Sequence, residues 1–248
     1  MDALLLVAVA LWCFTVAALG GLVGLVLGNI RLPVIVAAAS SPAAGAGANI
    51  GISAVSALTA AVTHIRGGRI DWRIFGWMTP PSVVGAVAGG LLSGEVPATA
   101  LLAVIGVTLL VFGADLLRPR RPRERRAEDV HPAAAVATGA VIGILGGFVG
   151  LILGSLRIGA LLRFVGEDTF RAVGTNLAVG FCLGVAGVFG HLNGGVDWTL
   201  LAVGAVASVP GALVGARLTG RLEERQLLRA VGVVLLIAGT SLLLQAFL

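Results

Sequence analysis

Two arginines, Arg31 and Arg157, each stand beside a long apolar stretch and are the clearest candidates for a functional site. No Asp, Glu, Lys or Arg occurs at positions 32–65 after Arg31 or at positions 130–156 before Arg157. A charge at membrane depth costs at least about 2.5–3.5 kcal/mol on insertion scales, so such a side chain usually faces a cavity and has a function. A guanidinium beside the free N–H groups of a broken helix forms an anion site. The pair therefore predicts anion binding. The alternative is that each arginine reaches an interface or a lipid phosphate.

Further polar residues near the two arginines could complete such a site. Asn29 and Ser155 each lie two residues before an arginine, where they could donate hydrogen bonds to an oxyanion or cap a helix. Asn49 and Asn176 lie near the start of predicted spanning helices, where the same two roles are open to them. The candidate substrate-binding residues are therefore Arg31, Arg157, Asn29, Ser155, Asn49, Asn176 and, through its hydroxyl, Thr175.

The elements that position these residues must be helices in a membrane. The chain is 58% hydrophobic and only 12% charged, whereas a soluble domain has about a quarter charged residues. Lipid must therefore cover most of its surface. Charge-free stretches approach or exceed the ~20 residues of a spanning helix, and the alternation of a β-barrel is absent. The predicted fold class is an all-α polytopic membrane protein.

The chain contains two copies of one pattern. Residues 19–32 and 145–158 are identical at nine of 14 positions. Further pairs are Gly47 with Gly174, Asn49 with Asn176, His64 with His191, Asp71 with Asp197, and Gly85 with Gly211. We therefore predict a first transmembrane repeat at residues 1–117, an Arg/Pro-rich aqueous linker at 118–131 and a second transmembrane repeat at 132–248.

The placement of arginines favours inverted repeats. Basic residues follow the second apolar stretch of the first half but the third of the second half, namely Arg66, Arg69 and Arg73, and Arg217, Arg221, Arg225 and Arg229. With inverted halves, all of them and the linker share one side, which the positive-inside rule places in the cytoplasm. Two-fold pseudosymmetry would then bring Arg31 and Arg157 near each other at the bilayer centre.

Inversion requires an odd number of crossings in each half. Three are predicted per half, at about 45–65, 74–94 and 97–117, and at 172–192, 198–217 and 227–247. The opening segment at about 3–40 would then enter and leave on one side as broken or re-entrant helices, interrupted at 28–33 and 40–42. A simple hydropathy count gives about eight hydrophobic segments, and two full crossings remain the alternative to each re-entrant hairpin.

Several function classes lack support in the sequence. The net charge of +5 comes from arginines in short loops, which argues against nucleic acid as a partner. Enzyme and metal-binding motifs are missing, so we expect no catalytic residue, no metal and no cofactor. A cation transporter would need acidic or thiol ligands in the spans. A non-transporting membrane subunit that recruits partners through the basic linker is the alternative function. Homodimerisation through a glycine face is left open.

The repeated motifs resemble the TauE/SafE family of sulfite exporters. Residues 20–33 (GGLVGLVLGNIRLP) and 146–159 (GGFVGLILGSLRIG) are similar to the family's Gly-rich openings, although each lacks two glycines of its G-x-G-G-G run. Residues 210–218 (PGALVGARL) and the Asp197-Trp198 pair before them are similar to its later motif. The resemblance implies export of sulfite or small organosulfonates, without ATP, across a bacterial cytoplasmic (inner) membrane with the linker in the cytoplasm.

Overall fold

The computed structural model describes residues 3–91, 98–118, 131–149, 152–191 and 195–247, and over these residues the chain is helical, without strands. The predicted linker lies almost wholly outside the described residues. The elements are α1 (Ala3–Val23), α2 (Gly28–Ala38), α3 (Pro42–Arg66), α4 (Trp72–Leu91), α5 (Ala98–Leu117), α6 (Pro132–Val149), α7 (Gly154–Ala160), the π-helix η2 (Leu161–Val165), α8 (Thr169–His191), α9 (Trp198–Thr219) and α10 (Glu224–Phe247).

Five helices are long and apolar enough, by length and composition, to cross a membrane: α1, α3, α8, α9 and α10. The last four coincide with predicted crossings. The crossings predicted at 74–94 and 97–117 coincide with α4 and α5, which do not meet this criterion over the described residues. The count of about eight segments is not confirmed, because each opening segment is divided into two helices, α1 with α2 and α6 with α7.

The first opening segment breaks earlier than predicted. α1 ends at Val23 because Gly24 adopts a left-handed conformation (φ 72°), which glycine tolerates without a Cβ clash. The Leu25 N–H then donates to the Gly20 carbonyl at 2.8 Å and closes the helix end. The interruption predicted at 28–33 is wrong in position, because α2 already begins at Gly28 and contains Pro33. The second interruption lies where expected, between α2 and α3.

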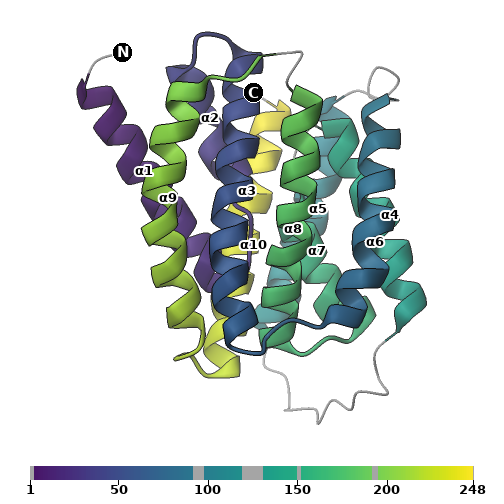
Figure 1. Ribbon diagram of the computed structural model, residues 1–248. Helices are drawn as coiled ribbons and strands as arrows, with labels where there is room; N and C mark the ends of the chain where they lie inside the picture. Colours follow the sequence, from purple (N-terminus) through teal and green to yellow (C-terminus); the bar gives the residue numbers. More distant parts are fainter. Residues whose placement is uncertain (1–2, 92–97, 119–130, 150–151, 192–194, 248) are drawn as a thin grey trace.

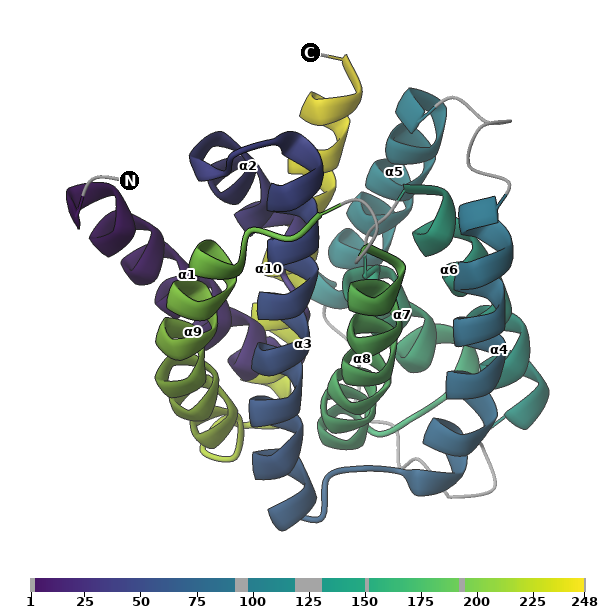
Figure 2. The ribbon, with the colours of Figure 1, turned by 45° about the horizontal axis from the view of Figure 1, so that its top comes forward.

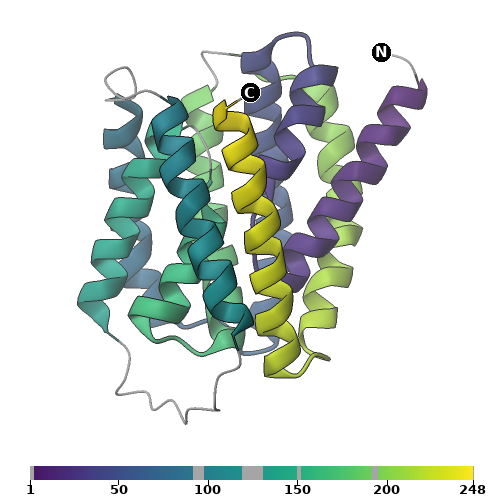
Figure 3. The same ribbon diagram turned by 180° about the vertical axis from the view of Figure 1, so that it is seen from behind.

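Equivalent helices of the two halves pack in equivalent ways (Figure 1). α1 packs along α9 at one side of the molecule, and its counterpart α6 packs along α4 at the other. Between these pairs, α3 packs against its own counterpart α8 (Figure 2), and α5 packs against α10 (Figure 3). Every pair therefore joins a helix of the first half to one of the second.

Counterpart helices in the middle of the molecule run in opposite directions. Asp197, beyond the end of α8, donates its N–H to the Ala44 carbonyl near the start of α3. At the other end, Asp71, beyond the end of α3, donates its N–H to the Thr175 hydroxyl in the first turns of α8. α5 and α10 are also antiparallel, because Gly106 faces Gly239 while Gly113 faces Gly232.

Candidate functional site

The first broken helix holds Arg31 against α3. Arg31 is 2% exposed, and its Nε donates to Asn49 Oδ1 at 2.9 Å. Its Nη2 donates to the Asn49 carbonyl at 3.0 Å and to Ser53 Oγ. Asn49 Nδ2 in turn donates to the carbonyl of Gly28, the first residue of α2, at 3.1 Å. One edge of the guanidinium, the edge formed by Nε and Nη2, is therefore bound by two residues of α3.

The second half repeats this arrangement with fewer bonds. Arg157 on α7 is fully buried, and its Nη1 donates to Asn176 Oδ1 on α8 at 3.1 Å. Asn176 Nδ2 donates to the Gly154 carbonyl at 3.0 Å, as Asn49 does to Gly28. The Nε and Nη2 atoms of Arg157 are buried without a hydrogen-bond partner among the described residues. The two clusters thus share one plan but leave the two guanidinium groups differently satisfied.

The stretch at residues 24–27 lies between the two clusters. Asn176 Nδ2 also donates to the Gly24 carbonyl at 2.6 Å, which ties the first broken helix to the second half. Gly154 lies against the Val26 backbone, and Val26 Cγ2 fills the space at Gly180, where a Cβ would approach it to 2.8 Å. The Asn176 side-chain amide thus donates to the carbonyls of Gly24 and Gly154, and it connects the broken helices of the two halves.

A small cavity lies beside Arg31. Its volume is about 10 Å³, roughly the room of one water molecule. Apolar residues form most of its wall, with Arg31, Ser53 and Ser56 as polar members and Leu177 contributed by the second half. This cavity is too small for a polyatomic anion.

The remaining predicted site residues are placed differently. Asn29 is buried, with its Nδ2 lacking a hydrogen-bond partner among the described residues, and Ser155 is buried on α7. Neither side chain caps its helix, because the N-cap residues are Leu27 and Leu153. Thr175 is fully buried, but its hydroxyl accepts the Asp71 N–H from the loop between α3 and α4. The structure thus joins Arg31 with Asn49 and Arg157 with Asn176, whereas Thr175 serves a loop contact.

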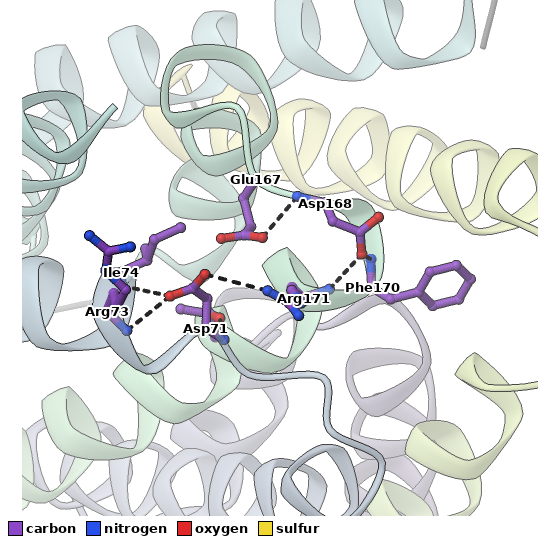
Figure 4. A network of polar contacts seen from close by, with 8 residues as sticks. Asp71, Arg73, Ile74, Glu167, Asp168, Phe170 and Arg171 are labelled. Carbon is purple, nitrogen blue, oxygen red and sulfur yellow. Dashed lines mark hydrogen bonds and ion pairs between the residues drawn. The ribbon is translucent and has the colours of Figure 1, made fainter. Parts of the chain in front are cut away.

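A second polar network lies at the end of the molecule where α3 finishes and α8 begins (Figure 4). Asp71 Oδ1 accepts the N–H groups of Arg73 and Ile74, which caps α4, and Asp71 Oδ2 lies 3.7 Å from Arg171 Nη1. The network therefore joins the loop after α3 to the start of α8.

Glu167 is the buried member of this network. It is 2% exposed, and its Oε1 accepts the Asp168 N–H at 2.9 Å. Burial, followed by the nearby carboxylate of Asp71, raises the pKa of Glu167 to about 7, while the Asp168 N–H and Arg171 act in the opposite direction. This carboxyl therefore exchanges its proton near neutral pH.

Ser53 and Gly180 are site residues that reasoning from sequence missed. They are equivalent in the two halves, and each lies four residues after the asparagine that binds the arginine. Residues four apart share a helix face, so this spacing is the signal that could have found them.

The chain is similar to a known family and to two curated membrane proteins. The chain matches the family described as "Sulfite exporter TauE/SafE" over residues 9–242. "Probable membrane transporter protein YjnA" of Bacillus subtilis (strain 168) is 26% identical over 253 residues, covering 96% of this chain and 99% of YjnA. "Probable membrane transporter protein YdhB" of the same organism is 28% identical over 207 residues, covering 79% of this chain and 83% of YdhB. No solved structure matches the chain. Because the family match spans nearly the whole sequence, the chain belongs to the TauE/SafE sulfite exporter family of membrane transporters.

Proposed function

We propose that this protein is a secondary transporter that moves small oxyanions, sulfite or small organosulfonates, out of the cytoplasm. The observation that carries the proposal is a guanidinium buried inside each half beside a broken helix. No carboxylate forms an ion pair with Arg31 or Arg157 among the described residues. A buried charge is costly unless it is paired, and a bound anion would pair it. The family match supports the transporter class and the choice of sulfite as the first substrate to test.

The two halves act as inverted repeats in this proposal. The antiparallel course of α3 with α8 and of α5 with α10 supports it, as does the crosswise packing of α1 with α9 and of α6 with α4. Inverted repeats place substrate sites at the repeat interface near the bilayer midplane. The bond from Asn176 to both broken openings lies at such an interface.

The same arrangement supports one orientation in the membrane. Arg69 Nη1 donates to the Ala216 carbonyl at 3.4 Å, so the arginine-bearing loop after α3 lies beside the arginine-bearing end of α9. Both loops then face the cytoplasm by the positive-inside rule, together with the linker.

The membrane potential supplies the driving force for export in this proposal. A potential of about 100 mV, negative inside, is worth about 2.3 kcal/mol per charge, or roughly a 50-fold concentration ratio for a monoanion. Export of a monoanion then requires no coupled ion.

The proposal is tested by sulfite entry into liposomes that contain the purified protein. Wild type is expected to show saturable uptake of labelled sulfite, and the double variant Arg31→Gln/Arg157→Gln is expected to lose it. Equal thermal stability in detergent would show that the variant is folded. Failure of folded wild type to transport sulfite or any of a panel of small organosulfonates would reject the proposal and favour the partner-recruiting subunit.

A further inference from the structure

The two buried arginines differ in the hydrogen bonding of one edge of the guanidinium, the edge formed by Nε and Nη2. Nε–H and one N–H of Nη2 point in parallel and form the fork that binds two oxygens of one anion. In Arg31 this fork is closed, because Asn49 and Ser53 accept from both nitrogens. In Arg157 the same two nitrogens are the atoms without a partner among the described residues, and α8 binds only Nη1.

One pair of equivalent positions contributes to the difference, beside the different nitrogen that each asparagine binds. Ser53 supplies a hydroxyl to Arg31 one helical turn after Asn49, whereas the equivalent position after Asn176 is Gly180. An added Cβ at Gly180 would lie 4.0 Å from Arg157 Nη1, so a serine there would bring a hydroxyl beside the nitrogen that already donates to Asn176. Glycine removes that acceptor from α8.

The Nε and Nη2 atoms of Arg157 are buried, so a bound ligand would have to supply their hydrogen-bond acceptors. Arg157 is fully buried, and a buried unpaired charge with two unsatisfied donor nitrogens is strongly destabilising. The cavity beside Arg31 does not offer an equivalent fork, because Nε and Nη2 of Arg31 are already bound to α3.

We propose that the anion site is single and lies in the second half, where the Nε–Nη2 fork of Arg157 binds two oxygens of one oxyanion. Arg31 is a positioning residue that holds α2 against α3. This assignment rests on the proposed function and deepens it. The ligand class is an anion that presents two oxygens on one atom, such as sulfite, a sulfonate or a carboxylate. A monatomic anion such as chloride accepts both N–H groups at one atom, through bent hydrogen bonds, and binds more weakly.

Calorimetric titration of the purified full-length protein with sulfite, methanesulfonate and chloride tests this assignment. Arg157→Lys keeps the charge but removes the fork, so sulfite affinity is expected to fall by roughly 10- to 100-fold. Arg31→Lys is expected to lower the melting temperature and to weaken sulfite binding less than Arg157→Lys does.

Gly180 provides a matched pair of variants that does not alter either arginine. Gly180→Ser and Gly180→Ala add the same Cβ against Val26, but only serine adds an acceptor for the guanidinium. Sulfite affinity is expected to be weaker in Gly180→Ser than in Gly180→Ala, because a second acceptor on α8 competes with the anion for the guanidinium. This comparison decides the matter if Arg31→Lys does not fold.

The outcomes separate the two proposals. If wild type neither binds nor transports any of the oxyanions, the proposed function fails. If wild type binds sulfite but Arg31→Lys and Arg157→Lys weaken it equally, or Gly180→Ser matches Gly180→Ala, the function stands and the single-site assignment is overturned. Chloride affinity equal to that for sulfite would also overturn the assignment.

Discussion

At the scale of single residues, Glu167 couples the molecule to pH. Its carboxyl is buried between the start of α8 and the loop after α3, and burial raises its pKa to about 7. A group whose pKa is higher in the folded state stabilises the fold at low pH. This contribution is fully present below the unfolded pKa of about 4.5 and is lost as the pH rises through about 7.

Glu167→Gln is expected to remove much of this pH dependence. Glutamine keeps an acceptor for the Asp168 N–H without a charge, so the variant should be more stable than wild type at pH 8, by roughly 1–3 kcal/mol. Thermal unfolding in detergent at pH 6 and pH 8 measures the effect. The exposed Glu223→Gln is the control and should leave the pH profile unchanged. A Glu167→Gln profile parallel to that of wild type would contradict the assignment.

The sequence showed that Arg31 and Arg157 are equivalent residues of the two repeats, because their isolation in apolar stretches and the repetition are both visible in one chain. It did not predict their inequality. That difference depends on Ser53 and Gly180, which lie on other helices and meet the guanidinium groups only after folding. Thr175 was predicted as a site residue through its hydroxyl, but successive helical residues point in different directions, and this hydroxyl accepts the Asp71 N–H.

At the scale of helices, glycines allow the close approach of pairs from the two halves. A Cβ added to Gly85 on α4 would lie 2.6 Å from the Ala140 carbonyl and 3.0 Å from the Ile144 N of α6. Neither backbone atom can move aside without shifting a helix. In lipid the hydrophobic effect does not drive helices together, and close van der Waals packing at small residues drives their association instead.

Gly85→Ala is therefore expected to destabilise the α4–α6 pair by about 1–3 kcal/mol. Gly76→Ala on the same helix is the matched control, because nothing lies within 4 Å of its added Cβ. Thermal unfolding of the two variants in detergent compares them directly. An equal melting temperature for both would show that close packing at Gly85 does not contribute to stability.

The position of the break in the first opening segment could not be predicted from the sequence. Pro33 suggested an interruption at 28–33, but the helix ends at Gly24, whose left-handed backbone and closing bond to Gly20 are decided by local geometry. The prolines of α4 and α9 likewise lie inside helices. In contrast, the apolar lengths of α8, α9 and α10 made their existence and approximate bounds predictable.

At the scale of the whole molecule, the proposed inversion defines which surfaces face the cytoplasm. Arg66 at the end of α3 and Arg225 at the start of α10 are exposed, and Arg69 joins the loop after α3 to the last turns of α9 at Ala216. Thr199, at the start of α9, is exposed near the opposite end of α3.

Single cysteines test this orientation after Cys13 and Cys182 are replaced by alanine. Arg66→Cys and Arg225→Cys should react with an impermeant maleimide only from the cytoplasmic side, and Thr199→Cys only from the opposite side. Labelling of intact and permeabilised cells measures this. Reaction of Arg66→Cys and Arg225→Cys from different sides would contradict the inverted topology.

The overall class and the repeat could be read from the sequence because lipid exposure and duplication affect every segment. The relative direction of the halves was inferred only from loop arginines, and contacts such as Asp197 with Ala44 were inaccessible to that reasoning. The hydrogen bond that connects the two breaks could not be predicted either, because Asn176 and Gly24 are far apart in the sequence.

The central claim is that this chain itself carries an oxyanion past Arg157, and the most direct measurement is the current across a supported bilayer containing purified protein after a sulfite jump. Wild type is expected to give a transient or steady current of the sign of a moving anion. Arg157→Gln, shown to be folded, is expected to give none. A current equally large in Arg157→Gln, or no current and no sulfite flux in folded wild type, would contradict the account.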